Sequence, residues 1–537
     1  MSKQSKAKRS SLDTSPATSD TYVFHLLAVL LPALILLAYA NSLHGGFVFD
    51  DIPLIRDSTS MTSIHTLADV LRSAMSVRGL LMVTYALNYY TSQLDTFTYH
   101  FTNLLIHLVN CGLVFFIIRR ITAQKFAQVT GTIIFAVHPL LSAAVASISG
   151  RSSLLCATFY FAAILCFFHR KWTLTVIYGL LAFWVKQEAI ALPLFLLAYV
   201  LIGYWHQRKP IWKPLAIFSV TAAVFLGYYY HQLRALFAMT SANKFLVAAG
   251  LNSVLPQPQF FYTYVTGVVG YLFPRMALPL RLNVDPMIPD ITHFYSLGFL
   301  ASAAFICVLV YVAIATHRQP LLSIGICALL FSPIAAYSLI PLADPILEHR
   351  AYIPMLGIAL LWAYFAESMS FDWPREYCVT SVLVVVLTFT LLTIARNRVY
   401  QSELTFWTSA VESAPTKPRP RLNLGTVYQM RHQNQEAIKQ YQIAVNLKPD
   451  LYAVYSNIGG LQIDSGNVAA GIATLQQVIA LAPNYAEPYI NLGVAYMRQG
   501  NYADSIGYFD RAIALNPSAE WAYKNRADAM KSLAAEK

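Results

Sequence analysis

The sequence contains little charge. Asp, Glu, Lys and Arg make up 12% of its 537 residues, whereas an average soluble domain is about 25% charged. Hydrophobic residues make up 57%, and the mean hydropathy is +0.50. This scarcity of charge excludes an ordinary soluble fold for most of the chain, and it indicates that a lipid bilayer surrounds that part.

Spacings typical of a metal or redox motif are also lacking. Most of the six cysteines lie inside apolar runs, as expected for buried and inert thiols (Cys111, Cys156, Cys166, Cys307, Cys327 and Cys378). His107 and His138 do not have the H-E-x-x-H spacing of a zinc site. The cysteines therefore identify no compartment, and the histidines predict no zinc site.

A continuous basic face is lacking as well, although the formal net charge is +12. Lys and Arg lie mainly at the ends of apolar runs, where they set the orientation of membrane helices. This distribution argues against nucleic acid as a partner.

The C-terminal part, residues 415–537, has a period of 34 residues. Three sets of residues keep this spacing: Pro449, Pro483 and Pro517; Asn423, Asn457 and Asn491; Gly425, Gly459 and Gly493. Each unit has an apolar helix pattern, a small-residue turn and a second helix, so this part resembles the tetratricopeptide repeat. We expect three repeats and a capping helix, which dock a polypeptide with Asn423, Asn457 and Asn491 on the docking face.

The preceding residues, 22–410, read as an all-α transmembrane body after a basic cytoplasmic tail, 1–21. We expect an uncleaved first helix, a first outer loop at about 44–100, and eleven spans. The expected spans are 23–40, 101–118, 126–148, 154–168, 172–185, 189–205, 214–230, 293–316, 321–342, 351–366 and 377–394.

The segment 260–280 leaves two topologies open. Gly267, Gly270, Pro274 and Pro279 interrupt it and Arg275 lies inside it, which favours a re-entrant or interfacial segment over a full span. An odd number of spans then places the repeats outside the cytoplasm, on the periplasmic side of the inner membrane if the protein is bacterial. Arg396 and Arg398 oppose this topology because they follow the last span on the outer side.

With this topology, several charged and polar side chains gather at the outer ends of the helices. Charge at membrane level is costly and usually lines a functional cavity. Asp50 and Asp51 are either a solvated loop end, a general base, or ligands of a divalent cation (Mg²⁺ or Mn²⁺, with Asp51 as a candidate ligand). Arg78, Arg275 and Arg350 either reach toward the membrane surface or hold a phosphate in a bidentate contact.

The order of the motifs carries a resemblance. Phe47-Val48-Phe49-Asp50-Asp51 comes first, and the remaining motifs follow in the order Asn103-x-x-x-His107, His138-Pro139, Gly150-Arg151, Lys186, Phe273-Pro274, Asn283-x-Asp285, and Glu348-x-Arg350-x-Tyr352-x-Pro354. Ahead of tetratricopeptide repeats, this order resembles the transmembrane and tetratricopeptide-repeat-containing O-mannosyltransferase family and its bacterial relatives, which are similar to GT-C glycosyltransferases.

The resemblance implies an integral-membrane enzyme that transfers a sugar from a polyprenyl-phosphate donor to Ser or Thr of an extracytoplasmic protein. It implies Asp50 or Asp51 as the catalytic carboxylate. The expected donor contacts are Arg78, Arg350, Arg275, Lys186 and His138, and the expected supporting residues are Glu188, Glu348, His107 and Tyr352. The chain departs from the family pattern where Ala143, Ala144, Val145 and Ser153 stand in place of acids, which puts metal dependence in doubt.

Two other functions remain open. A non-enzymatic scaffold would recruit partners through the repeats, and a transporter would move a lipid-linked sugar. The position of the Asp pair in an outer loop argues against the transporter, because coupling acids normally lie near the bilayer midplane.

Overall fold

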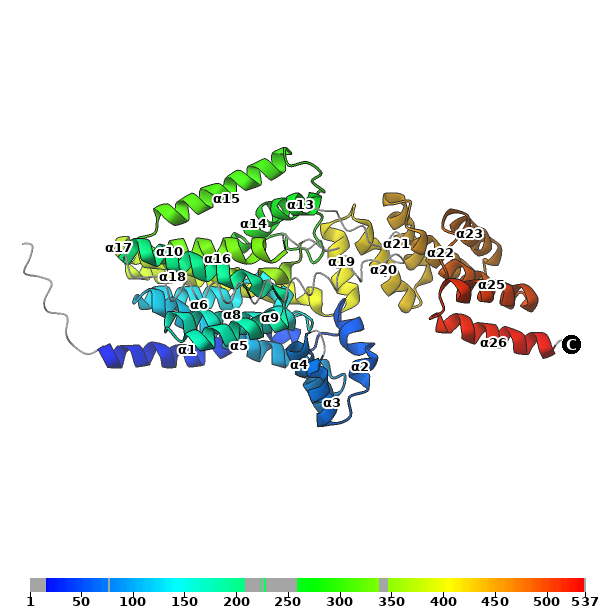
Figure 1. Cartoon of the computed structure of the whole chain (residues 1–537), viewed down its shortest axis with the longest axis horizontal. Coiled ribbons are helices and arrows are strands. Elements are labelled where there is room, and N and C mark those ends of the chain that lie inside the picture. The colour runs from blue at the N-terminus through cyan, green and yellow to red at the C-terminus, as the bar shows by residue number, and fades with distance from the viewer. Residues whose placement is uncertain are drawn as a thin grey trace, which may run out of the picture.

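The computed structural model of the chain describes residues 16–75, 78–207, 223, 227, 258–337 and 346–535. Helices are the only regular secondary structure in these ranges, which confirms the predicted all-α class. A helical body occupies one half of the elongated molecule, and an array of short helical hairpins occupies the other (Figure 1).

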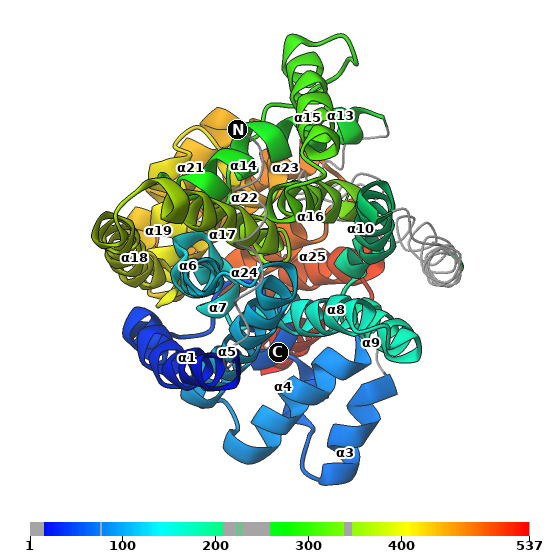
Figure 2. The same ribbon diagram turned by 90° about the vertical axis from the view of Figure 1, so that its left-hand side faces the viewer.

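In the described ranges, ten long helices build the body, and they run roughly along the long axis of the molecule (Figure 1). They are α1 (Pro16–Tyr39), α5 (Thr96–Ile121), α6 (Lys125–Val137), α8 (Arg151–Phe168), α9 (Trp172–Val185), α10 (Leu192–Gln207), α15 (Leu297–Ala315), α16 (Pro320–Tyr337), α17 (Met355–Asp372) and α18 (Arg375–Asn397). Viewed end-on, most of them form one bundle, from which α15 stands out together with the shorter α13, Gln259–Gly267 (Figure 2).

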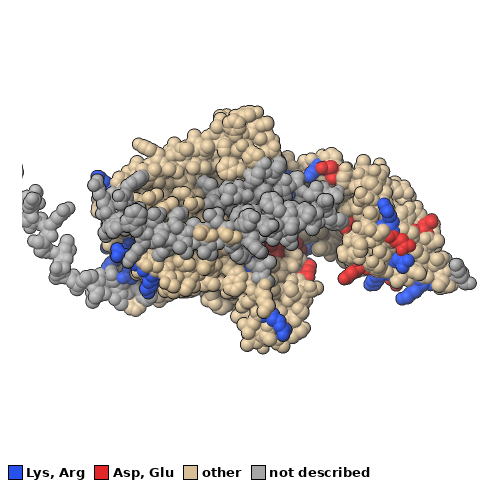
Figure 3. Space-filling model, in the orientation of Figure 1, with Lys and Arg blue, Asp and Glu red and all other residues tan. Residues whose placement is uncertain are grey.

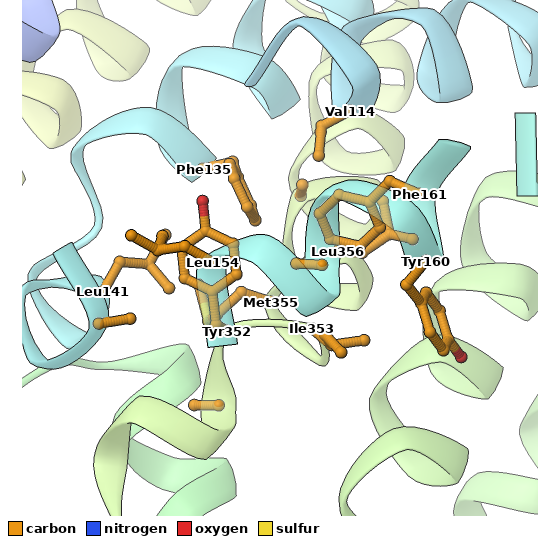
Figure 4. Packing of buried hydrophobic residues seen from close by; sticks show 14 of the residues in the cluster. Val114, Phe135, Leu141, Leu154, Tyr160, Phe161, Tyr352, Ile353, Met355 and Leu356 are labelled. Carbon is orange, nitrogen blue, oxygen red and sulfur yellow. The ribbon is translucent and has the colours of Figure 1, made fainter. Parts of the chain in front are cut away.

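Close helix contacts hold the centre of the body together. α17 packs between α6 and α16, and α8 packs between α5 and α9. A Cβ atom at Gly131 would lie 2.5 Å from the carbonyl oxygen of Ala359, and one at Gly357 would lie 2.6 Å from that of Gly325. Phe135, Phe161 and Leu356 belong to the buried apolar cluster of the body (Figure 4).

Four helices in the described ranges are long and apolar enough to cross a membrane: Thr96–Ile121, Arg151–Phe168, Leu297–Ala315 and Arg375–Tyr400. A fifth span results if α6 and the following bent segment, Pro139–Val145, count as one. The expected number of eleven is therefore not found. Several apolar helices are shorter than the roughly 20 residues that a bilayer requires, including Trp172–Val185 and Pro320–Pro333. The expected span 214–230 lies outside the described residues, apart from two positions.

The interrupted segment 260–280 stays near one end of the body. It forms α13 (Gln259–Gly267), the π-helical turn η6 (Val268–Leu272) and α14 (Phe273–Ala277). The Tyr264 hydroxyl donates to the Pro333 carbonyl oxygen at 2.7 Å, and the Tyr271 hydroxyl donates to Glu348 at 2.9 Å. Both partners lie at or beyond the C-terminal part of α16, so the segment does not run the length of the bundle.

The opposite end of the body carries the basic turns. The Tyr364 hydroxyl donates to Gln319 between α15 and α16, and the Thr122 hydroxyl donates to Glu367 on the same helix, α17. The turns after α5 and α15 therefore lie at one end, and Lys and Arg gather there on the face seen in Figure 3. We call this the basic end, and the end nearest the repeats the repeat-side end.

The repeats follow a connector helix, α19 (Glu403–Ser413). Three hairpins and a last helix then stack in order: α20 (Pro418–Met430) with α21 (Asn434–Leu447), α22 (Tyr452–Asp464) with α23 (Val468–Leu481), α24 (Glu487–Arg498) with α25 (Tyr502–Leu515), and α26 (Glu520–Ala535). Gly466 and Gly500 make two of the turns at φ +87° and +79°, a conformation that favours glycine.

Short elements at the repeat-side end carry most of the expected site residues. The first loop contains η2 (Ile52–Arg56), α2 (Thr59–Thr62), α3 (Leu67–Arg72), η3 (Ser73–Met75) and α4 (Gly79–Ser92). The others are η1 (Ala40–Ser42), η4 (Pro139–Leu141), α7 (Ser142–Val145), η5 (Gln187–Ala191), η7 (Glu348–Ala351) and η8 (Arg398–Tyr400).

Candidate functional site

The acidic loop, residues 46–51, lies between the body and the connector helix. The Gly46 N–H donates to the Gln401 carbonyl oxygen at 2.9 Å. The ring of Phe49 stacks on Phe406 with centroids 5.8 Å apart, and it meets Trp407 edge-on at 5.4 Å. The loop that carries the Asp pair is therefore held against the connector helix.

Asp51 is completely buried. Its Oδ2 accepts from the Val48 N–H at 3.0 Å, and its Oδ1 accepts from the Ser149 N–H at 2.6 Å. Burial raises the pKa of Asp51 to about 6, against the lowering effect of these hydrogen bonds. Asp51 thus fastens the acidic loop to the turn before α8, and its side chain does not face solvent.

Asp50 is the exposed member of the pair. Its neighbour Phe49 has φ 50°, a left-handed conformation that costs roughly 1–2 kcal/mol for a residue with a side chain. The strained Phe49 therefore lies directly before the exposed Asp50, and its own ring makes the contact with the connector helix. Strain of this kind is often found where a structure fixes a functional group.

Arg151, the first residue of α8, is completely buried beside this loop. Its guanidinium donates to Asn103 Oδ1 at 2.8 Å and to the carbonyl oxygens of Tyr99 and Thr84 at 2.9 and 3.1 Å. It also lies over the ring of Tyr85, 4.7 Å from the centroid. The Gly-Arg and Asn-x-x-x-His motifs therefore meet in one contact that joins α4, α5 and α8.

Three expected donor contacts share one region. Lys186 and Glu188 form a buried ion pair at 2.5 Å, and Lys186 Nζ donates to Ser153 Oγ at 2.8 Å. Burial lowers the pKa of His349, and the charges of Lys186, Arg350 and Arg78 lower it further. We call Arg78, Lys186 and Arg350 the basic cluster.

Arg78 is the member of the basic cluster whose charge also acts near the acidic loop. Burial raises the pKa of Tyr85, which also responds to the charges of Arg151, Asp51, Arg78 and Asp50. Arg78 is exposed at the start of α4. The charge of Arg78 therefore acts on Tyr85, as the Asp pair does, and it also acts on Lys186.

Glu348 has a different environment from the one expected of a reacting acid. It is buried, and its Oε2 accepts from Arg396 Nη2 at 2.7 Å. Its Oε1 accepts from the Tyr271 hydroxyl at 2.9 Å and from the Asn283 N–H at 2.7 Å. Arg396, which seemed to lie on the wrong side of the membrane, is thus the buried ion-pair partner of Glu348.

Asp285 joins the body to the repeats. Its buried carboxylate accepts from Lys417 Nζ at 2.5 Å and from Arg419 Nε at 2.9 Å, and both bases come from the start of the first repeat. The motif Asn283-x-Asp285 marks this residue in the sequence, but its basic partners were not predicted. Lys417 and Arg419, at the start of the first repeat, were the feature of the sequence that could have indicated the ion pair.

Arg275 and His138 lie on neighbouring elements. The Arg275 guanidinium lies over the ring of Tyr271 at 3.8 Å, with its Nε buried and lacking a hydrogen bond within the described residues. His138 Nδ1 accepts from the Leu140 N–H at 3.3 Å, and its ring meets Phe389 edge-on. His138 therefore caps η4 and packs in the body.

His107 and Tyr352 are core residues. His107 Nδ1 lies 2.7 Å from the Tyr352 hydroxyl, and its Nε2 lies 3.0 Å from the Ala136 carbonyl oxygen. Because that carbonyl can only accept, Nε2 carries the proton and the Tyr352 hydroxyl donates to Nδ1. Asn110 donates to the same hydroxyl at 3.2 Å. The network ties α5 to α6 and to the turn before α17.

The three repeat asparagines have unequal surroundings. Asn491 Nδ2 donates to the carbonyl and the hydroxyl of Ser456, both at 3.2 Å, which links two repeats. Asn457 Nδ2 lies 3.5 Å from the Tyr441 hydroxyl, and Asn423 is partly exposed on α20. Their expected part in docking an acceptor stays a prediction.

The donor set around Asp51 does not fit a divalent cation. Within the described ranges, His, Cys, Asp and Glu form no group of three or more that could hold a metal ion. Mg²⁺ requires about six oxygen ligands in octahedral geometry, whereas both carboxylate oxygens of Asp51 already accept backbone N–H groups. Asp51 therefore has no free carboxylate oxygen with which to hold such an ion.

Known proteins resemble the chain in both of its parts. A tetratricopeptide-repeat family model matches residues 457–520. The protein O-mannosyl-transferase TMTC3 of Mus musculus is 26% identical over 482 residues, which cover 80% of this chain and 52% of that protein. TMTC3 of Homo sapiens is 25% identical over the same shares. The family resemblance is confirmed.

The chain spans about half the length of these curated relatives. Tmtc3 of Drosophila melanogaster gives a similar match, 24% identical over 79% of this chain and 55% of that protein. Among solved structures, the crystal structure of MamA protein aligns with 25% of this chain and 72% of its own at 23% identity and a TM-score of 0.22, which is too low to compare arrangements.

Proposed function

We propose that this protein is an integral-membrane glycosyltransferase of the GT-C type, which transfers mannose from a polyprenyl-phosphate donor to Ser or Thr of a protein. The observation that carries the proposal is that the exposed Asp50 and the cation Arg78 both act electrostatically on Tyr85, while Arg78 acts together with Lys186 and Arg350 on His349. The printed names of the relatives, protein O-mannosyl-transferase, supply the sugar and the class of acceptor.

The reaction needs two groups of opposite charge. The acceptor hydroxyl attacks the anomeric carbon, and Asp50 takes the hydroxyl proton as general base, a role worth about 10²–10⁴-fold in rate. The bond from the anomeric carbon to the phosphate oxygen breaks, and the phosphate leaves with the electron pair. The basic cluster would stabilise the negative charge of that leaving group, and attack opposite to it inverts the anomeric centre.

The proposed topology places the repeats outside the cytoplasm. Three features support it: the segment 260–280 stays near one end, the basic turns after α5 and α15 share the other end, and Arg396 is neutralised by Glu348. A reporter fused after Lys537 should be active only outside the cytoplasm. Reporter activity in the cytoplasm would show that the repeats lie on the cytoplasmic side, against the proposal.

Sugar transfer from purified polyprenyl-phosphate mannose to an acceptor peptide in detergent tests the catalytic role. We expect Asp50→Asn to lower turnover by about a hundredfold or more, the scale of a lost general base. Asp57→Asn is the matched control, because Asp57 lies in the same loop, is 55% exposed and pairs with Arg56. Equal rates in wild type and Asp50→Asn would remove the acidic loop from the chemistry.

The same assay tests the basic cluster. Arg350→Lys keeps the charge but loses the planar two-pronged donor, so we expect weaker use of the donor lipid. Arg72→Lys serves as control, since Arg72 is 71% exposed and pairs with Asp69 on its own helix. A scaffold or a transporter would show no sugar transfer in any variant, and lipid-linked sugar crossing the bilayer without transfer would favour the transporter.

A further inference from the structure

The acidic loop is assembled from both halves of the chain. Val48 is 1% exposed and belongs to an apolar cluster with Phe406, Trp407 and Ala410 of the connector helix. Leu424 and Val427 of the first repeat complete this cluster, together with Ala143 and Ala146 of the α7 region. The residues that precede Asp50 therefore pack on helices of the C-terminal part.

Asp50 is fixed from its two sides by different partners. On one side, Phe49 is held at φ 50° against Phe406 and Trp407. On the other, Asp51 binds the Ser149 N–H of the body. The left-handed backbone of Phe49 sets the direction of the Asp50 side chain. Without the ring contact this backbone would relax to negative φ, and the Asp50 carboxylate would point elsewhere.

We propose that Phe49 and Trp407 are positioning residues for the general base, so that the connector helix forms part of the catalytic end of the enzyme. The expected effect on turnover rests on the proposed function of Asp50. The expected effect on the conformation of residues 48–52 rests on the ring geometry alone. Phe49 and Trp407 would act only through Asp50, without touching the substrate.

The Asp285 contact supports the inference independently. Lys417 and Arg419 lie a few residues beyond the C-terminal end of α19 and bind Asp285 of the body. The connector helix is therefore fixed at both ends, by the Gln401 contact before it and by this ion pair after it. A helix held in this way can maintain a strained neighbour in one conformation.

The test uses the full-length protein in detergent with Trp407→Ala, Trp407→Phe and Phe49→Gly. Phe49→Gly removes the ring that holds the loop, and glycine adopts both signs of φ, so residues 48–52 lose their single conformation even if Trp407→Ala fails to fold. Phe509→Ala is the matched control, because Phe509 is a buried aromatic residue of the last hairpin, packed on Gly493.

Two measurements separate the inference from the proposed function. Amide hydrogen exchange at residues 48–52 should speed up about tenfold or more in Trp407→Ala and in Phe49→Gly, and stay unchanged in Phe509→Ala. Turnover should fall about tenfold at an unchanged KM for the donor lipid, and Trp407→Phe should restore it.

Unchanged exchange at residues 48–52 in both variants that remove a ring would overturn the inference. Faster exchange with no change in turnover would also overturn it as a statement about catalysis. If Asp50→Asn itself has no effect on turnover, the proposed function fails, while the exchange measurement still decides whether the connector helix holds the loop.

Discussion

Two acidic regions of the repeat-side end differ in how their carboxylates are satisfied. In the later region, Glu348 binds Arg396, and Asp285 binds Lys417 and Arg419. In the first loop, Asp51 accepts two backbone N–H groups and Asp50 is exposed. Buried acids with a basic partner therefore join separate elements, Asp51 fixes its own loop through backbone N–H groups, and Asp50 stays near solvent.

The largest expected effect concerns the Glu348 ion pair. Glu348→Gln leaves the Arg396 charge buried without its acid, so we expect a loss of about 3–5 kcal/mol in the free energy of unfolding. Thermal unfolding in detergent measures the loss. The double variant Glu348→Gln with Arg396→Met should recover most of the stability, because replacing both charges removes the desolvation cost. A double variant as unstable as Glu348→Gln would contradict the structural role.

Asp285→Asn should have a smaller effect. Lys417 and Arg419 are 25% and 27% exposed, so water can solvate them once the acid is gone. We expect a loss of about 1.5–3 kcal/mol, the range for hydrogen bonds to charged groups, and faster proteolysis between the body and the first repeat. Asp464→Asn is the control, since its pair with Arg498 links two repeats at the surface and is worth about 0–1 kcal/mol. Equal proteolysis in both variants would contradict the joining role.

The smallest expected effect is a dependence on pH. The pKa of Asp51 is raised to about 6 by burial, so Asp51 becomes neutral as the pH falls through that value. A protonated carboxyl can no longer accept from both the Val48 and Ser149 N–H groups, and we expect turnover to fall between pH 7 and pH 5. Because the folded state binds this proton more tightly than the unfolded state, acidification through pH 6 does not destabilise the fold through Asp51.

Measuring turnover and thermal unfolding over the same pH range separates the two effects. The decline in turnover should be absent from the profile of Asp51→Asn, and the unfolding temperature of the wild type should not fall in parallel with turnover. The same decline in Asp51→Asn would assign the titration to another group.

The repeats were predictable from the sequence because their contacts are local and periodic. Gly459 and Gly493, which keep the 34-residue spacing, lie at close helix contacts, where a Cβ atom would approach Leu475 and Phe509 to 2.7 and 2.5 Å. Adding a methyl group at such a contact costs about 1–3 kcal/mol. The 34-residue period in the sequence follows from this packing, because each hairpin packs on the next in the same way.

The pairing of charges in the body was not predictable in the same way. Arg396 and Glu348 are 48 residues apart, and no periodic pattern links them. A basic residue after the last helix predicts a cytoplasmic position only if its charge remains unpaired, and the sequence alone cannot show the pairing. The number of spans was overestimated for a related reason, because hydropathy does not reveal where a bend or a short helix interrupts an apolar run.

The helix α15 depends on the bilayer more than its neighbours do. Only 11% of the most apolar stretch of α15 is buried in the protein, compared with 67% for Arg151–Phe168. The helix packs mainly on α13 and α16. In a short-chain detergent, α15 should therefore be the first helix to detach. Its loss would remove a neighbour of the segment that presents Tyr271 to Glu348. The choice of detergent or nanodisc thus determines whether the purified protein keeps the packing of α15 against the segment 260–280.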